Sequence, residues 1–331
     1  MPARLSRAGH DSGQTAGPRH VMMAAKLSIT AVLLALFVWR IDLHALLIAI
    51  RDVSAGGWLM NLLLFLAAHL LAAYKWRLLL PEGRFGTLLK LNFVGQYYGM
   101  LLPGQIAGEA VKAYRLGKGQ QNAERLAASV VIDRITGFLG LLAVALCGIA
   151  LSWSSARQTI LAALLLAVVA LCALLFSFQL PWWERASQML SRRGARAERV
   201  AGQLLRLLVA WRDYARAPLQ LLVSVLVGAA FQLIAVWINF RIGKEVGLTV
   251  AFADWCWVFG IVSIVTALPF TVAGLGLREG SFVGALALLG VASEKAVAVS
   301  FVVFSLLLAG AAIGAVLEFS RPRATTATRP A

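Results

Sequence analysis

The chain has 331 residues, of which 60% are hydrophobic and 14% are charged, and its formal net charge is +16. This balance excludes an ordinary soluble domain, in which about a quarter of the residues are charged. Residues 135–156 and 217–240 carry no ionisable side chain, and each stretch exceeds the ~20 residues that a helix needs to cross a bilayer. The sequence therefore predicts an all-α polytopic membrane protein.

The first apolar segment, residues 21–39, follows a polar tail, residues 1–20, that contains three arginines. It is long for a signal peptide, and Arg40 follows it in place of a small-residue cleavage pattern, so we expect an uncleaved span. Hydrophobicity predicts a single transmembrane domain, residues 21–320, followed by a tail, residues 321–331. The predicted full crossings are 21–40, 57–76, 125–152, 157–180, 217–240 and 294–318.

The positive charge gathers in alternate loops. Eight arginines lie between Arg185 and Arg216, and further basic clusters lie near residues 75–90 and 112–125. If both chain ends are cytoplasmic, these clusters are cytoplasmic too, as the positive-inside rule requires. We therefore expect a bacterial inner membrane protein that does not bind nucleic acid. Within residues 182–216, apolar positions at helical spacing predict an amphipathic helix on the cytoplasmic leaflet, anchored by Trp182 and Trp183.

Two further apolar regions, about 88–117 and 252–290, are each interrupted near the middle by proline and glycine. The segment Leu-Pro-Gly-Gln-Ile-Ala-Gly at 102–108 resembles Leu-Pro-Phe-Thr-Val-Ala-Gly at 268–274, and the separation of 166 residues is half the chain. We predict an inverted-topology repeat with halves at about 21–152 and 157–318.

Each half of this repeat would contain a re-entrant or kinked hairpin. The expected breaks are Pro103, Gly104 and Gly108, and Pro269, Gly274 and Gly276. Backbone groups left unpaired at a break require protein or water around them, so we expect a cavity near the middle of the membrane. The alternative is that both prolines simply kink or end helices.

Ionisable residues at membrane depth are expensive and usually functional. The candidates for substrate binding are Glu109, Arg115, Asp133, Arg134, Arg278 and Glu279. We expect the arginines, with helix amino termini at the breaks, to hold a phosphate, and the carboxylates to carry protons or balance charge. Asp133 and Arg134 are neighbours on a helix and should engage different partners. The alternative is a structural ion pair with the first hairpin, and Lys112 is expected only to signal topology.

The sequence shows no pattern for a cofactor or for catalysis. The four histidines are scattered without metal-ligand spacing, and all three cysteines lie in apolar segments. A Gly-rich Lys-Ser/Thr phosphate loop and a Cys/His or Ser/His constellation are also lacking. We expect no metal, no cofactor and no catalytic residue.

The motifs Asn92-Phe-Val-Gly95, 102–115, Asp133-Arg134-Ile-Thr-Gly137 and 269–280 together resemble the transmembrane-region family of lysylphosphatidylglycerol synthases, also called flippase-like membrane proteins. The resemblance spans about 27–318. Ala107 and Glu109 depart from it, where Gly and more often Asp are expected. Bifunctional members carry a soluble aminoacyl-transferase domain after the membrane region, whereas only residues 321–331 follow the last span here.

The resemblance implies movement of a modified phospholipid, another polar lipid or a lipid-linked intermediate across the membrane. The expected partners are membrane lipids with anionic or modified headgroups. Two alternatives stay open: a membrane-embedded enzyme that uses Asp133 or Glu109 as a base, and a non-catalytic subunit of a lipid-biosynthetic complex.

Overall fold

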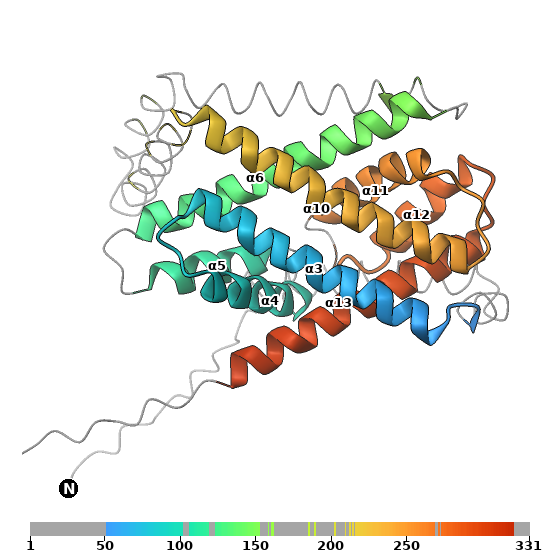
Figure 1. Cartoon of the computed structure of the whole chain (residues 1–331), viewed down its shortest axis with the longest axis horizontal. Helices are drawn as coiled ribbons and strands as arrows, with labels where there is room; N and C mark the ends of the chain where they lie inside the picture. The colour runs from blue at the N-terminus through green and yellow to red at the C-terminus, as the bar shows by residue number, and fades with distance from the viewer. Residues whose placement is uncertain are drawn as a thin grey trace, which may run out of the picture.

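The computed structural model describes residues 51–101, 106–118, 123–152, 216–268 and 273–320, together with Thr271 and isolated positions between 158 and 214. Within these ranges every regular element is an α-helix (Figure 1). The helices are α3 (Ala55–Leu79), α4 (Phe85–Leu101), α5 (Ile106–Gly117), α6 (Ala123–Leu151), α10 (Pro218–Glu245), α11 (Phe252–Ala267), α12 (Leu277–Ala287) and α13 (Ser293–Phe319). The expected span 21–40, nearly all of the expected span 157–180, both tails and most of the segment 182–216 lie outside the described residues.

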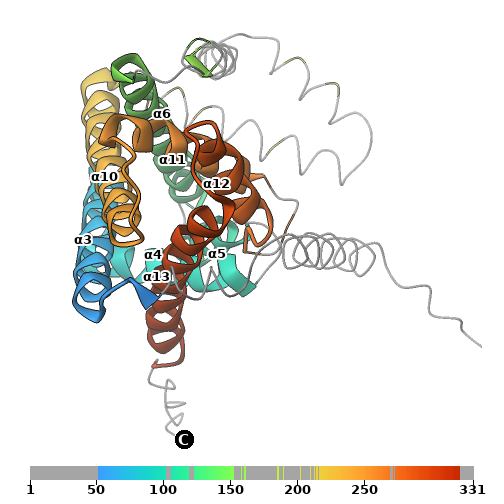
Figure 2. The same cartoon turned by 90° about the vertical axis from the view of Figure 1, so that its right-hand side faces the viewer.

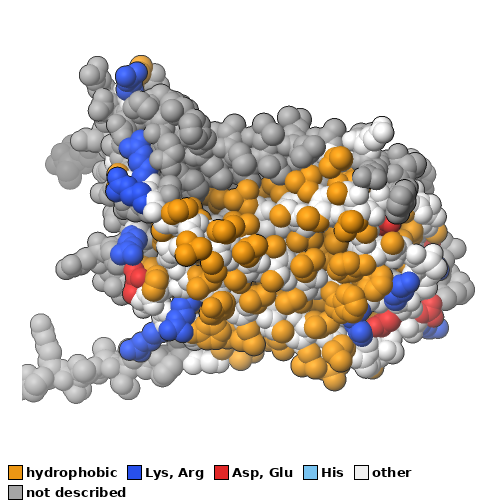
Figure 3. Space-filling view, turned by 45° about the horizontal axis from the view of Figure 1, so that its top comes forward, with side chains coloured by type: hydrophobic (Ala, Val, Ile, Leu, Met, Phe, Trp, Pro, Cys, Tyr) orange, Lys and Arg blue, Asp and Glu red, His pale blue; other side chains and the backbone are white. Residues whose placement is uncertain are grey.

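Four of the described helices are long and apolar enough to cross a membrane: α3, α10, α13 and residues Arg125–Leu151 of α6. They coincide with the predicted segments 57–76, 217–240, 294–318 and 125–152. Large apolar side chains such as Leu63, Leu226 and Val316 point outward along them. Figure 3 shows the resulting apolar band between two charged ends, one with mostly Lys and Arg and the other with Lys and Arg beside Asp and Glu. An outward apolar surface of this extent is what a hydrocarbon environment requires.

The other four helices are shorter and form two hairpins. Helices α4 and α5 have 17 and 12 residues, and α11 and α12 have 16 and 11. At 1.5 Å per residue their lengths are about 25, 18, 24 and 17 Å, less than the ~30 Å of a hydrocarbon core.

The two hairpins open toward opposite ends of the bundle. At one end, Glu82 before α4 lies 3.7 Å from Arg125 at the start of α6, which follows α5. At the other end, Lys295 in the first turn of α13, which follows α12, donates to the carbonyl oxygen of Gly247, just before α11 (3.2 Å). Each hairpin therefore begins and ends at a single end of the molecule (Figure 1).

The described helices of the two halves follow the same order: long, short, short, long. Helices α3 and α10 pack side by side in opposite directions, because Arg241 bonds to Asn61 (3.2 Å) at one end and Gln220 to the carbonyl oxygen of Leu78 (2.5 Å) at the other. Helix α4 packs against α13, and α11 against α6 (Figure 2). Each hairpin therefore packs against the long final helix of the other half, and the inverted-topology repeat itself stays a prediction.

Equivalent glycines mediate the two exchanged packings. A Cβ atom on Gly314 of α13 would lie 2.1 Å from the carbonyl oxygen of Phe93 in α4, and one on Gly148 of α6 would lie 2.6 Å from that of Ala253 in α11. These glycines are 166 residues apart, the separation of the sequence motifs. The halves differ in one respect: α10 also packs along α6, whereas α3 has little contact with α13.

The predicted breaks have different outcomes. Gly274 and Gly276 have φ angles of +73° and +81°, and the turn that contains them separates α11 from α12. Gly108 was assigned wrongly, because it lies inside the first turn of α5. A Cβ atom there would meet the carbonyl oxygen of Gly95 at 2.1 Å, so Gly108 allows the two arms of the hairpin to pack closely. Pro103, Gly104 and Pro269 lie outside the described residues.

Candidate functional site

Charged side chains of α3, α5 and α6 meet beside the first hairpin. Glu109 of α5 accepts from the guanidinium of Arg134 in α6 and lies 3.0 Å from the ammonium of Lys112, one turn further along α5. Asp133 of α6 instead faces Lys75 of α3, with 3.1 Å between Oδ1 and Nζ. We call these five residues the first charge cluster.

The divergence of Asp133 and Arg134 was predicted from the sequence. Adjacent positions on a helix are about 100° apart, so the two side chains reach different neighbours. Arg134 pairs with the first hairpin, as the structural alternative expected, and Asp133 pairs with α3. The small residue Gly140, on the same side of α6 as Asp133, allows α10 to approach, since its Cβ would lie 2.5 Å from the backbone nitrogen of Ala229.

Arg134 is the accessible member of the first charge cluster. Its side chain is 57% exposed, against 15% for Glu109 and 10% for Lys112. It stands nine positions after Arg125 at the start of α6, so it lies about 14 Å further along the helix. A guanidinium at this depth requires polar surroundings, because hydrocarbon does not solvate it. The Oε2 atom of Glu109 is buried and has no hydrogen-bond partner.

Lys112 was interpreted wrongly as a topology signal. Its side chain is buried, it pairs with Glu109, and its ammonium lies 5.5 Å from the centre of the Trp76 ring. Lys75, counted among the loop charges, is also buried, and its ammonium donates to the backbone carbonyl of Asp133 (2.6 Å). No local sequence signal distinguishes these two lysines from the surface ones, because their partners are on other helices.

Arg115 lies apart from the first charge cluster. Its guanidinium makes a two-pronged ion pair with Glu318 near the end of α13, and it donates to the hydroxyl of Tyr98 in α4 (3.2 Å). This contact joins both arms of the first hairpin to α13. Glu318 was not among the predicted site residues, since it stands 203 positions away from Arg115.

Arg278 and Glu279 form a second, enclosed site at the tip of the second hairpin. Their side chains are 5% and 1% exposed, and the carboxylate accepts from the Arg278 guanidinium (2.5 Å) and from the backbone N–H of Gly276 (2.6 Å). Ser300 of α13 bonds to both residues, and the guanidinium lies 4.6 Å from the centre of the Phe304 ring. The hydroxyl of Thr271 is buried without a partner in the turn that precedes them.

The predicted site residues thus occupy three places. Glu109, Asp133 and Arg134 belong to the first charge cluster, Arg115 is bound to α13, and Arg278 with Glu279 closes the second hairpin. Among the residues that the structure describes, no hydrogen bond or ion pair joins the first charge cluster to Arg278 or Glu279. The side chain of Arg134 is exposed, whereas that of Arg278 is buried.

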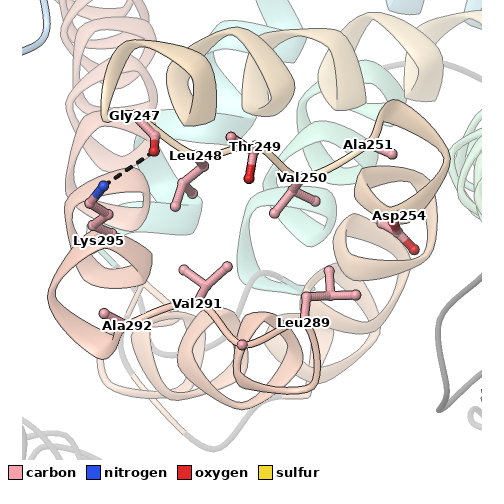
Figure 4. A pocket seen from close by; sticks show the side chains of 11 residues that line it. Gly247, Leu248, Thr249, Val250, Ala251, Asp254, Leu289, Val291, Ala292 and Lys295 are labelled. Carbon is pink, nitrogen blue, oxygen red and sulfur yellow. Dashed lines mark hydrogen bonds between the residues drawn. The ribbon is translucent and has the colours of Figure 1, made fainter.

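A hollow of about 480 Å³ lies at the end of the bundle where the second hairpin opens (Figure 4). It is lined by the turn after α10 and the turn before α13, and includes Leu248, Asp254, Val291 and Lys295. None of the predicted site residues lines it. The predicted mid-membrane cavity would border the two breaks, of which 102–105 and 269–270 lie outside the described residues, so that cavity stays a prediction.

The fold and these sites define a polytopic α-helical membrane protein with two opposed hairpins and charged residues enclosed within its bundle. The family model of the lysylphosphatidylglycerol synthase TM region matches residues 23–314, so this chain belongs to that family. Comparison with curated proteins and with solved structures finds no match.

Proposed function

We propose that this protein moves a polar or modified phospholipid, or a lipid-linked intermediate, across the membrane. The observation that supports this most is the exposed guanidinium of Arg134, about 14 Å along a membrane-spanning helix. A lipid headgroup that crosses the bilayer needs polar groups at that depth, since hydrocarbon alone opposes its passage. Family membership supports the same role in membrane lipid metabolism or transport.

Arg134 is suited to an anionic headgroup. A planar guanidinium offers paired donors to phosphate, and Glu109 occupies one side of it. An arriving phosphate would share Arg134 with Glu109, which keeps Lys112 as its second partner at 3.0 Å. The carboxylate would therefore balance the guanidinium when no lipid is bound. We propose no catalytic step and no cofactor for this chain.

We place the more basic end of the bundle in the cytoplasm. That end carries Arg77, Arg84, Lys90, Lys118, Arg125 and Arg216, with Glu82 among them. Among the described residues, the opposite end carries equal numbers of each sign: Arg51, Arg241, Lys244 and Lys295 with Asp52, Glu245, Asp254 and Glu294. The positive-inside rule then assigns α4 and α5 to a hairpin that enters from the cytoplasm. In a bacterium this is the inner membrane.

The test is leaflet-resolved translocation of labelled lipids in proteoliposomes. The panel contains anionic, aminoacylated and isoprenoid-linked lipids, and compares wild type with Arg134→Ala, Arg278→Ala and the control Arg125→Ala. Arg125 is 61% exposed and its pair with Glu82 is loose at 3.7 Å, so its loss should leave translocation unchanged.

We expect Arg134→Ala to abolish translocation without unfolding the protein, because Glu109 keeps its contact with Lys112. Normal movement in both the Arg134 and Arg278 variants would overturn the site assignment. If folded wild type moves none of the lipids, the transport proposal itself is wrong, and a lipid-modifying or accessory role takes its place.

A further inference from the structure

His69 lies near the middle of α3 and joins three helices. Its Nδ1 atom is 3.0 Å from the carbonyl oxygen of Phe65 on the same helix, and its Nε2 atom is 2.7 Å from Oε1 of Gln96 in α4. The amide nitrogen of Gln96 donates in turn to the carbonyl oxygen of Leu307 in α13 (2.8 Å). Among the described residues, no hydrogen bond joins this relay to the first charge cluster.

The geometry specifies how many protons the ring needs. A backbone carbonyl can only accept, so Leu307 fixes the Gln96 amide with its oxygen toward the histidine. Both ring nitrogens of His69 then face acceptors. Only the doubly protonated ring donates to both, and each neutral tautomer leaves a lone pair opposed to an oxygen at 3.0 or 2.7 Å.

The aromatic neighbours favour the charged ring. His69 stacks on Phe93 with centroids 4.6 Å apart and planes at 11°, and it lies 4.3 Å from the Phe65 ring. Aromatic faces attract a cation, most strongly where water is excluded. Burial within the bundle opposes the charge, and so does the ammonium of Lys112 on α5. The aromatic rings thus favour the charged form of His69, whereas burial and Lys112 favour its neutral form. A ring balanced between the two forms can gain and lose a proton.

The remaining charged side chains on the helices packed around α3 stand further along those helices. Most are already paired or lie near a helix end. On α3 itself Lys75 pairs with Asp133, and Glu109 on α5 pairs with Lys112 and Arg134. The others are Arg77 on α3, Lys90 on α4, Arg115 on α5, Glu124 and Arg125 on α6, Arg241, Lys244 and Glu245 on α10, and Glu294, Lys295 and Glu318 on α13.

We propose that His69 is a proton-binding site that controls the attachment of the first hairpin to α13. When the proton leaves Nε2, a hydrogen bond to the ring requires Gln96 to turn its amide, which places Oε1 against the Leu307 carbonyl and breaks the link to α13. The link is tightly packed, since a Cβ atom on Gly310 would lie 2.6 Å from the Gln96 amide nitrogen. Where the proposed transport holds, proton binding at His69 sets its pH dependence.

The proton site is tested without transport, by ¹⁵N NMR of the histidine-labelled full chain in nanodiscs. The His69 signals are those that His69→Phe removes from the spectra of the four histidines. We expect both ring nitrogens to be protonated in acid, and Nε2 to lose its proton as the pH rises. Gln96→Met removes an acceptor from the charged ring, so it should move that midpoint to lower pH. A ring that stays singly protonated throughout, or a midpoint unchanged in Gln96→Met, overturns the proposal.

The second measurement is the pH dependence of lipid translocation in proteoliposomes. Wild type should follow the NMR midpoint, whereas His69→Phe, which preserves the aromatic packing, should show no dependence on pH around that midpoint. If both proteins respond to pH alike, His69 does not control transport. If no lipid moves in wild type, the proposed function fails, and the NMR titration still decides the proton site.

Discussion

Glu109→Gln tests whether the first charge cluster holds the first hairpin in place. The substitution keeps the shape of the side chain and removes its charge. Lys112 then loses its ion-pair partner while its side chain is 10% exposed, and Arg134 loses its carboxylate. Because water cannot solvate Lys112 fully, its charge becomes a cost to the folded state.

The matched control is Glu82→Gln. Glu82 also pairs with a cation, Arg125, but the two side chains are 43% and 61% exposed and 3.7 Å apart. Breaking a buried ion pair costs about 3–5 kcal/mol, whereas an exposed pair contributes about 0–1 kcal/mol. At roughly 2 °C per kcal/mol in a chain of this size, Glu109→Gln should lower the melting midpoint by about 6–10 °C and Glu82→Gln by less than about 2 °C.

The assay is thermal unfolding in detergent, followed by size-exclusion chromatography of the heated samples. Lys112→Met added to Glu109→Gln removes the stranded cation, so the double variant should recover at least half of the lost stability. Equal melting midpoints for Glu109→Gln and Glu82→Gln would refute the reasoning, since Lys112 would then be compensated by other groups. A double variant less stable than Glu109→Gln would refute it as well.

Two further predictions concern contacts between helices. Gly314→Ala should lower the melting midpoint by several degrees, because its Cβ would lie 2.1 Å from a carbonyl oxygen of α4, whereas Gly284→Ala, with open space around it, should not. Equal changes of the melting midpoint in the two variants would contradict the close packing of α4 against α13. Arg115→Lys keeps the charge but loses the two-pronged contact with Glu318, so it should cost about 1–3 kcal/mol in the same assay, against no measurable change for Arg84→Lys at the surface. Full stability of the Arg115 variant would mean that its ion pair does not hold α13.

The sequence predicted the features that depend on neighbouring residues. Runs of apolar residues located α3, α6, α10 and α13 to within a few positions, because the length of an uncharged helix follows from the thickness of the bilayer. A break near Gly274 and Gly276 was expected because proline and glycine interrupt the apolar region 252–290, and both glycines adopt positive φ in the turn. The different partners of Asp133 and Arg134 followed from helical geometry alone.

Only the tertiary structure decided which charges meet. The sequence alone suggests that Lys112 is a surface charge. In the structure it is buried with Glu109, because α5 packs beside Trp76 of α3. The pairing of Arg115 with Glu318 and the relay from His69 through Gln96 to α13 join residues far apart in the chain. Gly108 was read as a break because a motif does not reveal that a second backbone passes 2.1 Å from its missing side chain. Ion pairs and close backbone contacts depend on distances between helices, and those distances are fixed by packing over the whole bundle, so composition and spacing cannot specify them.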